Sequence, residues 1–274
     1  MSSAQGQCCR MRVLDMSSKN SQRPKAARAA PETSDDAFLG GRVRVLQPRS
    51  GFRSGLDAVM LAAAVPAKSN ERICDVGAGV GTAALCLAAR VPGLHVTVIE
   101  LNPQFASLAR SNFERNAVAQ SFECIVADVL ERPRTIVRQA YQHVLTNPPF
   151  HDTARGTAAP EPDKARATSL NASQLGVWLR FARALVRPKG TLTAILPPAQ
   201  IPLALNAISP EGLGVEIIPL WPSIDVAAKR VILRARTNSK TSLRLHPGLT
   251  LFEQGGASAK AAEAILRHGH ALGT

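Results

Sequence analysis

The stretch Ile73-Cys74-Asp75-Val76-Gly77-Ala78-Gly79-Val80-Gly81-Thr82 decides how this chain folds. A short apolar run contains an acid, and three alternating glycines then lead into a segment rich in alanine and leucine. This order predicts a buried parallel strand, a tight turn and the start of a helix. Glycines let the backbone adopt positive φ and approach a ligand closely, and the helix N-terminus behind them offers unpaired N–H groups. The turn is therefore the first candidate binding site.

The spacing of these glycines distinguishes between cofactors. A dinucleotide fingerprint needs G-x-G-x-x-G, but its third glycine, counted from Gly77, falls on Thr82. The pattern is D-x-G-x-G-x-G, which resembles motif I of the S-adenosylmethionine-dependent methyltransferases. A strand–helix turn that binds nothing is the alternative explanation of the glycines taken alone.

Strands and helices alternate on the C-terminal side of this turn. Such an alternation predicts an α/β fold with a parallel, doubly wound sheet, in which ligands bind outside the carboxyl ends of the strands. The predicted strands are residues 72–76, 95–99, 122–127, 143–146, 191–196, 214–220 and 230–235. The predicted helices are residues 58–65, 82–90, 103–116, 172–185, 202–208 and 257–268.

The first 36 residues differ from everything after them. They are rich in Ser, Ala, Gln and Arg and show no hydrophobic periodicity, so we expect a disordered basic tail over residues 1–36 and one domain over residues 37–274. A short hairpin strand is predicted within residues 39–48, after Gly40-Gly41.

Acids follow two more of the predicted strands. Glu100 ends the second strand and Asp128 ends the third, while Asp75 lies in the first. An acid placed like Glu100 can accept hydrogen bonds from ribose hydroxyls. Each acid alone could be an ordinary exposed carboxylate, but three at one edge of a sheet predict the lining of a cofactor pocket.

The fourth strand ends in Asn147-Pro148-Pro149-Phe150, the most specific signal in the chain. Two prolines fix φ, supply no N–H donors and hold the preceding backbone extended. The Asn147 side-chain oxygen and the Pro148 carbonyl can then accept both hydrogens of a planar exocyclic amine, while Phe150 stacks on its ring. Such acceptors favour a pyramidal nitrogen with an exposed lone pair. A proline-rich strand exit without chemistry is the alternative.

These motifs together resemble the N-P-P-[FY] class of amino-methyltransferases, and most closely the bacterial adenine-N6 methyltransferases of valine tRNA. The resemblance implies a Rossmann-like class I fold with a mostly parallel seven-stranded sheet and a C-terminal antiparallel strand. It implies S-adenosyl-L-methionine as cofactor and Asn147, Pro148, Pro149 and Phe150 as catalytic residues. The implied cofactor-binding residues are Asp75, Gly77, Ala78, Gly79, Gly81, Glu100, Leu101, Asp128 and Asn147.

Three further stretches carry the narrower resemblance. Residues 47–57 are similar to a family segment that closes over the cofactor, residues 164–168 to a basic stretch after the catalytic loop, and residues 229–233 to a late strand. The family commonly has Tyr where this chain has Phe150, and Phe150-His151 also resembles guanine-N2 enzymes of ribosomal RNA. Two more hypotheses fit the sequence, namely a protein-glutamine methyltransferase and a non-catalytic RNA-binding protein.

The chain is strongly basic, with a formal net charge of +13. A basic surface attracts polyanions, and an RNA substrate, most simply a tRNA, is the partner we expect. The late basic residues would track its phosphates, although a solvated strand edge explains them equally well. These residues are Lys229, Arg230, Arg234 and Arg236.

The cysteines and the hydropathy of the chain indicate the cellular compartment that we expect for the protein. The five cysteines form no C-x-x-C pair, and three of them fall in predicted core elements, so we expect no metal site and a reduced, cytoplasmic protein. No apolar run approaches the roughly 20 residues that span a bilayer, so no membrane is expected as a partner.

Overall fold

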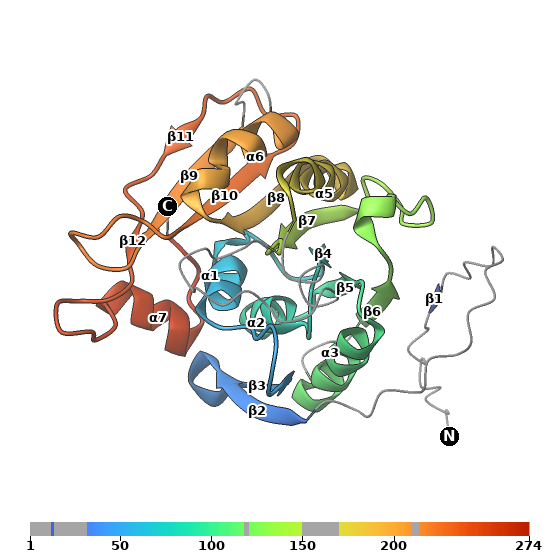
Figure 1. The fold of residues 1–274 in the computed structure, drawn as a ribbon, viewed down its shortest axis with the longest axis horizontal. Helices are drawn as coiled ribbons and strands as arrows, with labels where there is room; N and C mark the ends of the chain where they lie inside the picture. Colours follow the sequence, from blue (N-terminus) through green and yellow to red (C-terminus); the bar gives the residue numbers. More distant parts are fainter. Residues whose placement is uncertain (1–11, 14–31, 118–120, 150–169, 210–213, 274) are drawn as a thin grey trace.

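A computed structural model describes residues 12–13, 32–117, 121–149, 170–209 and 214–273. A long twisted sheet runs through the molecule, with helices on both of its faces (Figure 1). Seven strands make up most of this sheet, in the spatial order β6-β5-β4-β7-β8-β10-β9. They are β4 (Arg72–Val76), β5 (His95–Glu100), β6 (Ser121–Val126), β7 (Tyr141–Thr146), β8 (Val186–Leu196), β9 (Val215–Trp221) and β10 (Arg230–Arg236).

The pairing within the sheet confirms the predicted fold class. Strands β4 to β8 pair in parallel, and β10 is antiparallel to both β8 and β9. The described sheet also includes three two-residue strands that the sequence did not predict, so it has ten strands rather than seven. They are β1 (Arg12–Val13), β11 (Arg244–Leu245) and β12 (Leu249–Thr250). Strand β1 pairs with β6, and β11 and β12 pair with β9.

In the described ranges, six α-helices cover the sheet in two layers. One layer holds α1 (Leu56–Ala64), α2 (Thr82–Arg90), α3 (Pro103–Asn116) and α7 (Lys260–His268), and the other holds α5 (Ala172–Leu185) and α6 (Ile201–Ile208). Each layer buries its own hydrophobic cluster against the sheet. The bounds of α2, α3 and α5 are those predicted from sequence, because each has a clear apolar face and a helix-ending signal.

A separate hairpin corrects the predicted start of the ordered chain. Strand β2 (Thr33–Phe38) pairs with β3 (Val43–Pro48) through the short turn η1 (Leu39–Gly41), so the structure begins inside the segment assigned to a tail. Asp35 and Asp36 disfavour a strand by propensity. Their ion pairs with Arg44, Arg53 and Arg115 explain why β2 forms nonetheless.

The hairpin is fastened to α3 by two asparagine side chains. Asn112, fully buried, accepts from the Leu46 N–H at 2.7 Å and donates to the Leu46 carbonyl at 3.0 Å. Asn116 makes the same pair of bonds with the backbone of Arg44, at 2.8 and 2.7 Å. Each amide thus satisfies a residue of β3 as a neighbouring strand would, which explains how an otherwise unpaired strand edge is covered.

The topology determines where a ligand can bind. The carboxyl ends of β6, β5, β4 and β7 lie next to one another at one edge of the sheet, which we call the carboxyl edge. The opposite, amino edge carries the first residues of the same strands. All the predicted cofactor residues follow or end strands at the carboxyl edge.

Candidate functional site

The glycine turn after β4 forms the centre of the carboxyl edge. Gly77, Gly79 and Gly81 have φ of 74°, 57° and 84°, values that other residues adopt only under strain. The N–H groups of Gly77 and Ala78 donate to the Ile99 carbonyl at 2.8 and 3.1 Å, so the turn is tied to β5. Helix α2 begins directly afterwards, at Thr82. The sequence therefore predicted both the backbone of this turn and its place.

Packing excludes side chains from two of the three glycines. A Cβ atom on Gly77 would lie 2.4 Å from the Trp178 ring, and one on Gly81 would lie 3.0 Å from Phe113. Of the described residues, a Cβ on Gly79 would meet Phe52 alone, at 4.0 Å. Gly77 and Gly81 thus serve close packing beneath the turn, whereas the described part of the chain leaves space beside Gly79.

Glu100, at the end of β5, is bonded to the glycine turn. One of its carboxylate oxygens accepts from the Gly79 N–H at 2.7 Å, and the other accepts from the Asn102 N–H at 2.8 Å. Burial raises the pKa of Glu100, while the backbone donors at Asn102, Gly79 and Leu101 act in the opposite direction. The carboxylate therefore holds the turn in shape and keeps further lone pairs for a ligand. Contact with a ribose stays a prediction.

Asp75 lies buried below the same turn, with an exposed fraction of 2%. Burial raises the pKa of Asp75 to about 7, with a smaller increase from the charge of Glu100 and a decrease from the Ala84 N–H. Among the described residues, its Oδ2 has no hydrogen-bond partner. A buried acceptor without a donor is costly, so Asp75 is poised either to be protonated or to take a donor from outside the chain.

Asp128 and Leu101 complete the cofactor side of the edge. Asp128 follows β6 and caps the short helix η2 (Val129–Glu131) by accepting from the Leu130 N–H at 2.8 Å. Leu101, directly after Glu100, is 57% exposed, which is unusual for a large apolar side chain. The edge thus carries acids at the ends of β6 and β5 and an exposed apolar side chain beside them.

Asn147 stands at the exit of β7, beside the glycine turn. Its neighbour Thr146 pairs with Val76, the residue before Gly77, so the two strand exits are adjacent. In the described part of the chain the buried Asn147 Oδ1 has no hydrogen-bond partner. The Pro149 carbonyl accepts from the Leu170 N–H at 3.1 Å, which brings the chain back towards α5. Phe150 and the basic stretch 164–168 lie outside the described residues.

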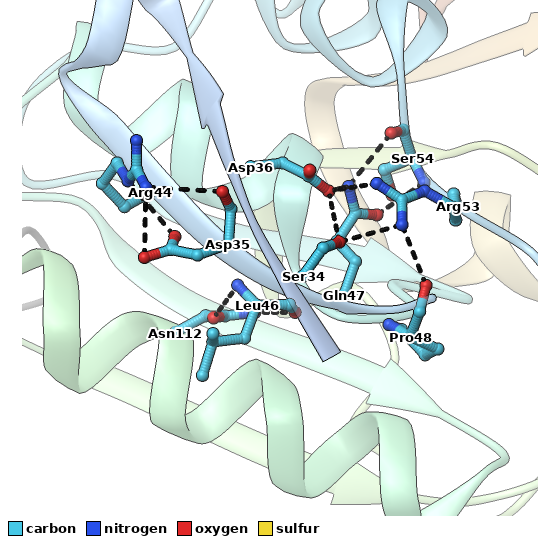
Figure 2. A network of polar contacts seen from close by, with 10 residues as sticks. All are labelled: Ser34, Asp35, Asp36, Arg44, Leu46, Gln47, Pro48, Arg53, Ser54 and Asn112. Carbon is cyan, nitrogen blue, oxygen red and sulfur yellow. Dashed lines mark hydrogen bonds and ion pairs between the residues drawn. The ribbon is translucent and has the colours of Figure 1, made fainter. Parts of the chain in front are cut away.

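The segment 49–55 before α1 is held by a polar network (Figure 2). Gln47, 1% exposed, accepts from the Ser54 N–H at 2.7 Å and donates to the Ser54 carbonyl at 3.2 Å. Asp36 accepts from Gln47 at 2.8 Å and from Arg53 at 2.6 Å. This network sets the position of Phe52, which is 51% exposed and lies above Gly79. In the sequence, this segment could be identified only by its similarity to a family segment, because its hydrogen-bond partners lie in the β2–β3 hairpin.

The four late basic residues do not form one exposed track. The Arg230 Nε donates to Asp57 at 2.9 Å. Arg234, 12% exposed, donates to Glu216 at 2.7 Å and to the Ala64 carbonyl at 3.0 Å. Only Lys229 and Arg236 are exposed, and they lie at opposite ends of β10. Helix α1 supplies the partner of Arg230, and β9 and α1 together supply those of Arg234.

The described residues hold neither a metal-ion cluster nor a membrane-spanning helix. Those ranges contain no group of three or more His, Cys, Asp or Glu side chains arranged to hold a metal ion. None of their helices is long and apolar enough to cross a membrane.

Comparisons with known proteins agree with the resemblance expected from sequence. Residues 54–160 match the family model of the methyltransferase small domain. The tRNA1(Val) (adenine(37)-N6)-methyltransferase of Enterobacter sp. is 32% identical over 59% of this chain, and the match spans 65% of its own length, just under two thirds. The protein of the same name from Shewanella amazonensis is 26% identical over 79% of this chain and 91% of its own.

A solved structure supports the fold. The crystal structure of a predicted O-methyltransferase from Agrobacterium tumefaciens has a TM-score of 0.66 and 25% identity, covering 79% of this chain and 98% of that one. The described sheet and helices are therefore those of a Rossmann-like class I methyltransferase.

Proposed function

We propose that this chain, which carries a methyltransferase small domain over residues 54–160, transfers a methyl group from S-adenosyl-L-methionine to adenine N6 in a tRNA. The class I fold and the row of strand-end residues support the reaction type. The names of the similar bacterial proteins support tRNA adenine as the substrate class. The chain's own residues supply reasons for each part of the proposal.

The residues at the glycine turn fit the cofactor. Gly79 leaves open space above the turn, and the Oδ2 of Asp75 is a buried acceptor that no described residue satisfies. We assign Glu100 to the ribose hydroxyls, Leu101 to the apolar face of the adenine ring and Asp128 to the adenine amine. When bound, S-adenosyl-L-methionine supplies a methyl group on a positively charged sulfur. The turn and Glu100 would orient that group towards the exit of β7.

The observation that carries the proposed chemistry is the buried Oδ1 of Asn147, which has no hydrogen-bond partner among the described residues. An exocyclic amine is a poor nucleophile because its lone pair is delocalised into the ring. Asn147 Oδ1 and the Pro148 carbonyl would accept one amine hydrogen each and draw the lone pair out of conjugation. Both bonds strengthen as the nitrogen gains positive charge, so they favour the transition state. The methylated nitrogen is positively charged and acidic, so it releases a proton to water without help from a strong base.

Phe150 would stack on the target base, since a base taken out of its own stack needs a new surface. Of the basic residues expected to hold RNA, Lys229 has the best-supported role, because it is exposed and β10 begins at the carboxyl edge. Arg230 and Arg234 are assigned to the fold through Asp57 and Glu216. The cytoplasm is the proposed compartment, and the described cysteines, which are buried thiols, are compatible with it.

Nucleoside mass spectrometry tests the proposal directly. The tRNA, ribosomal RNA and protein fractions of cells that lack the gene are each incubated with the purified protein and S-adenosyl-L-methionine carrying a labelled methyl group. We expect label in N6-methyladenosine and none when the Asn147→Ala protein is used. Label in N2-methylguanosine would identify a guanine enzyme, and label only in protein would identify a glutamine enzyme. Absence of label together with absence of cofactor binding would point to a non-catalytic RNA-binding protein.

A further inference from the structure

Trp178 touches both strand exits of the candidate site. This side chain projects from α5 and is buried, with an exposed fraction of 9%. Its six-membered ring lies so close to Gly77 that a Cβ there would be 2.4 and 2.7 Å from two ring atoms. Its Nε1 donates to the Thr146 hydroxyl at 2.9 Å. A single side chain therefore contacts the start of the cofactor turn and the residue before Asn147.

The hydrogen bonds continue from Trp178 back to the strand before the turn. The Thr146 hydroxyl accepts from Trp178 and donates to the Val76 carbonyl at 2.7 Å. Thr146 is fully buried, so neither bond is exchanged with water. Val76 precedes Gly77 and Thr146 precedes Asn147. The indole, the hydroxyl and the two strand ends consequently form one closed set of contacts.

The residue before the N-cap of α5 is also bonded to the segment that follows Asn147. The Leu170 N–H donates to the Pro149 carbonyl at 3.1 Å, directly before the Asn171 N-cap of the helix. Asn171 and Gln174 form a capping box, which fixes where the helix starts. The helix that carries Trp178 is therefore bonded to both sides of Asn147, at Thr146 and at Pro149.

We propose that Trp178 is a positioning residue that couples the cofactor site to the base-acceptor site; this rests on the proposed function. A ligand bound at the glycine turn would press against Gly77. Gly77 cannot move away from the ligand, because the Trp178 ring packs against it on the other side. The indole in turn is held by Thr146. Packed interiors yield in discrete steps rather than continuously. Cofactor binding therefore sets the position of Asn147, and a bound base favours the cofactor to the same degree.

The chemistry of the indole fits this role better than that of an ordinary core residue. A residue needed only to fill the core could be Leu or Phe, which have no donor to satisfy. Trp178 and Thr146 instead each bring a polar atom into a buried place and satisfy it with the other. That arrangement favours one orientation of the ring, because a ring turned away from Thr146 loses the acceptor of its buried N–H.

Fluorescence tests the first link, between the cofactor turn and Trp178. The chain has two tryptophans, and Trp221 lies on β9 with its Nε1 donating to the Pro247 carbonyl. Trp221→Phe therefore leaves Trp178 as the single emitter. We expect saturating S-adenosyl-L-homocysteine to change its emission intensity or maximum. Unchanged emission, with calorimetry showing that the ligand is bound, would overturn the proposal.

Thr146→Val tests the second link, with Thr146→Ser as its matched control. Valine keeps the shape but removes both hydrogen bonds, whereas serine keeps the hydroxyl. The affinity for S-adenosyl-L-homocysteine is measured with and without tRNA from cells that lack the gene. We expect the tRNA to tighten it at least about fivefold in the wild type and in Thr146→Ser, and by less than about twofold in Thr146→Val.

Single-turnover rates at saturating tRNA and cofactor give an independent readout. Thr146→Val should be at least about tenfold slower than Thr146→Ser, while its affinity for S-adenosyl-L-homocysteine alone stays within about threefold. Equal rates and equal coupling in the two variants would overturn the proposal. So would a lowered melting temperature with both sites weakened together, because that pattern belongs to a purely structural residue. A wild-type protein that methylates no tRNA would instead contradict the proposed function.

Discussion

The amino and carboxyl edges of the central sheet carry similar polar groups, but these groups differ in whether neighbouring residues satisfy their hydrogen bonds. At the amino edge, His143 is buried between Thr191 and Glu71, with its ring nitrogens 2.7 and 2.9 Å from their oxygens. At the carboxyl edge, Asp75 is buried and Asn147 is half-buried, yet each has a buried oxygen without a hydrogen-bond partner among the described residues. Both edges contain groups that can do acid–base or hydrogen-bond chemistry. Among these described groups, those at the amino edge satisfy one another, and those at the carboxyl edge leave an acceptor for a ligand.

The amino edge shows why residue type alone is a poor guide. A hydroxyl, an imidazole and a carboxylate in hydrogen-bond contact are the components of a catalytic triad. Here Thr191 is 1% exposed and no substrate could reach it. Burial lowers the pKa of His143, with Glu71 acting in the opposite direction. The three groups satisfy one another and join β4, β7 and β8, so their role is structural.

Removing a side chain at each edge should separate activity from stability, and this is the largest effect we expect. Asn147→Ala should lower the single-turnover rate by about 10²–10³ and leave the free energy of unfolding unchanged or increased. His143→Ala removes the partner that Glu71 and Thr191 share, so it should cost about 1–3 kcal/mol of stability while the rate stays within a few-fold. Urea titration and single-turnover kinetics measure both quantities. The reverse pattern would assign function to the wrong edge.

Within the carboxyl edge, the two glycines Gly77 and Gly79 provide a matched pair for stability. Both have positive φ, but only Gly77 lies against the Trp178 ring. Gly79→Ala should cost about 1–2 kcal/mol from backbone strain. Gly77→Ala should cost a further 1–3 kcal/mol or so from overpacking, and Trp178→Leu in the same chain should recover part of that loss. Equal melting temperatures for the two single variants would contradict the packing seen beneath Gly77.

Asp75, whose Oδ2 no described residue satisfies, should give the protein without cofactor a pH-dependent stability. Because burial raises the pKa of Asp75 to about 7 in the folded state, this group binds a proton that the unfolded chain has already released. Its contribution is fully present at acid pH and is lost as the pH rises towards 7. Between pH 5 and 7 we expect a loss of about 2 kcal/mol, at roughly 1.4 kcal/mol for each pH unit.

Asp75→Asn is the control for that slope. Asparagine has the same shape and no titration, so its unfolding free energy should change less between pH 5 and 7 than that of the wild type. Burial also raises the pKa of Glu100, and the comparison of the two proteins removes its contribution because Glu100 is present in both. Parallel stability curves for wild type and variant would show that Asp75 does not titrate in this range.

Glu100→Ala should weaken cofactor binding by at least about tenfold. The change removes the acceptors for the Gly79 and Asn102 N–H groups and the assigned ribose contact, and hydrogen bonds to charged groups are worth about 1.5–3 kcal/mol each. Calorimetry with S-adenosyl-L-homocysteine measures the loss. Glu71→Ala, which removes an acid at the amino edge, should leave that affinity unchanged. Unaltered affinity in Glu100→Ala would refute the ribose assignment.

The smallest effect concerns RNA, where two exposed lysines at opposite edges can be compared. Lys229 lies at the carboxyl edge and Lys68 precedes β4 at the amino edge. Lys229→Gln should make the salt dependence of tRNA binding shallower by about 0.7, the value for one lost contact to a single strand. Lys68→Gln should leave the slope as it is. The same decrease in both variants would mean that only net charge matters.

Much of the fold could be predicted from the sequence because its signals are local. Helices α2, α3 and α5 follow from apolar residues at helical spacing, and the glycine turn follows from residues that tolerate positive φ. The row formed by Asp75, Glu100, Asp128 and Asn147 was also predictable, since parallel strands bring their carboxyl ends to one edge. Strand β2 was missed because its acids disfavour a strand and only their arginine partners stabilise it.

The sequence alone determined which residues stand at the end of each strand, and with them the chemistry available at the carboxyl edge. The tertiary structure alone decided which polar groups are satisfied and which are left for a ligand. Arg234 donates to the carbonyl of Ala64, 170 residues away, and Trp178 donates to the hydroxyl of Thr146, 32 residues away. No local pattern encodes such pairs, because they depend on the order of strands in the sheet and on which face each helix covers. The physical reason is that burial and hydrogen bonding belong to the assembled core, whereas φ, ψ and hydrophobic spacing belong to the chain.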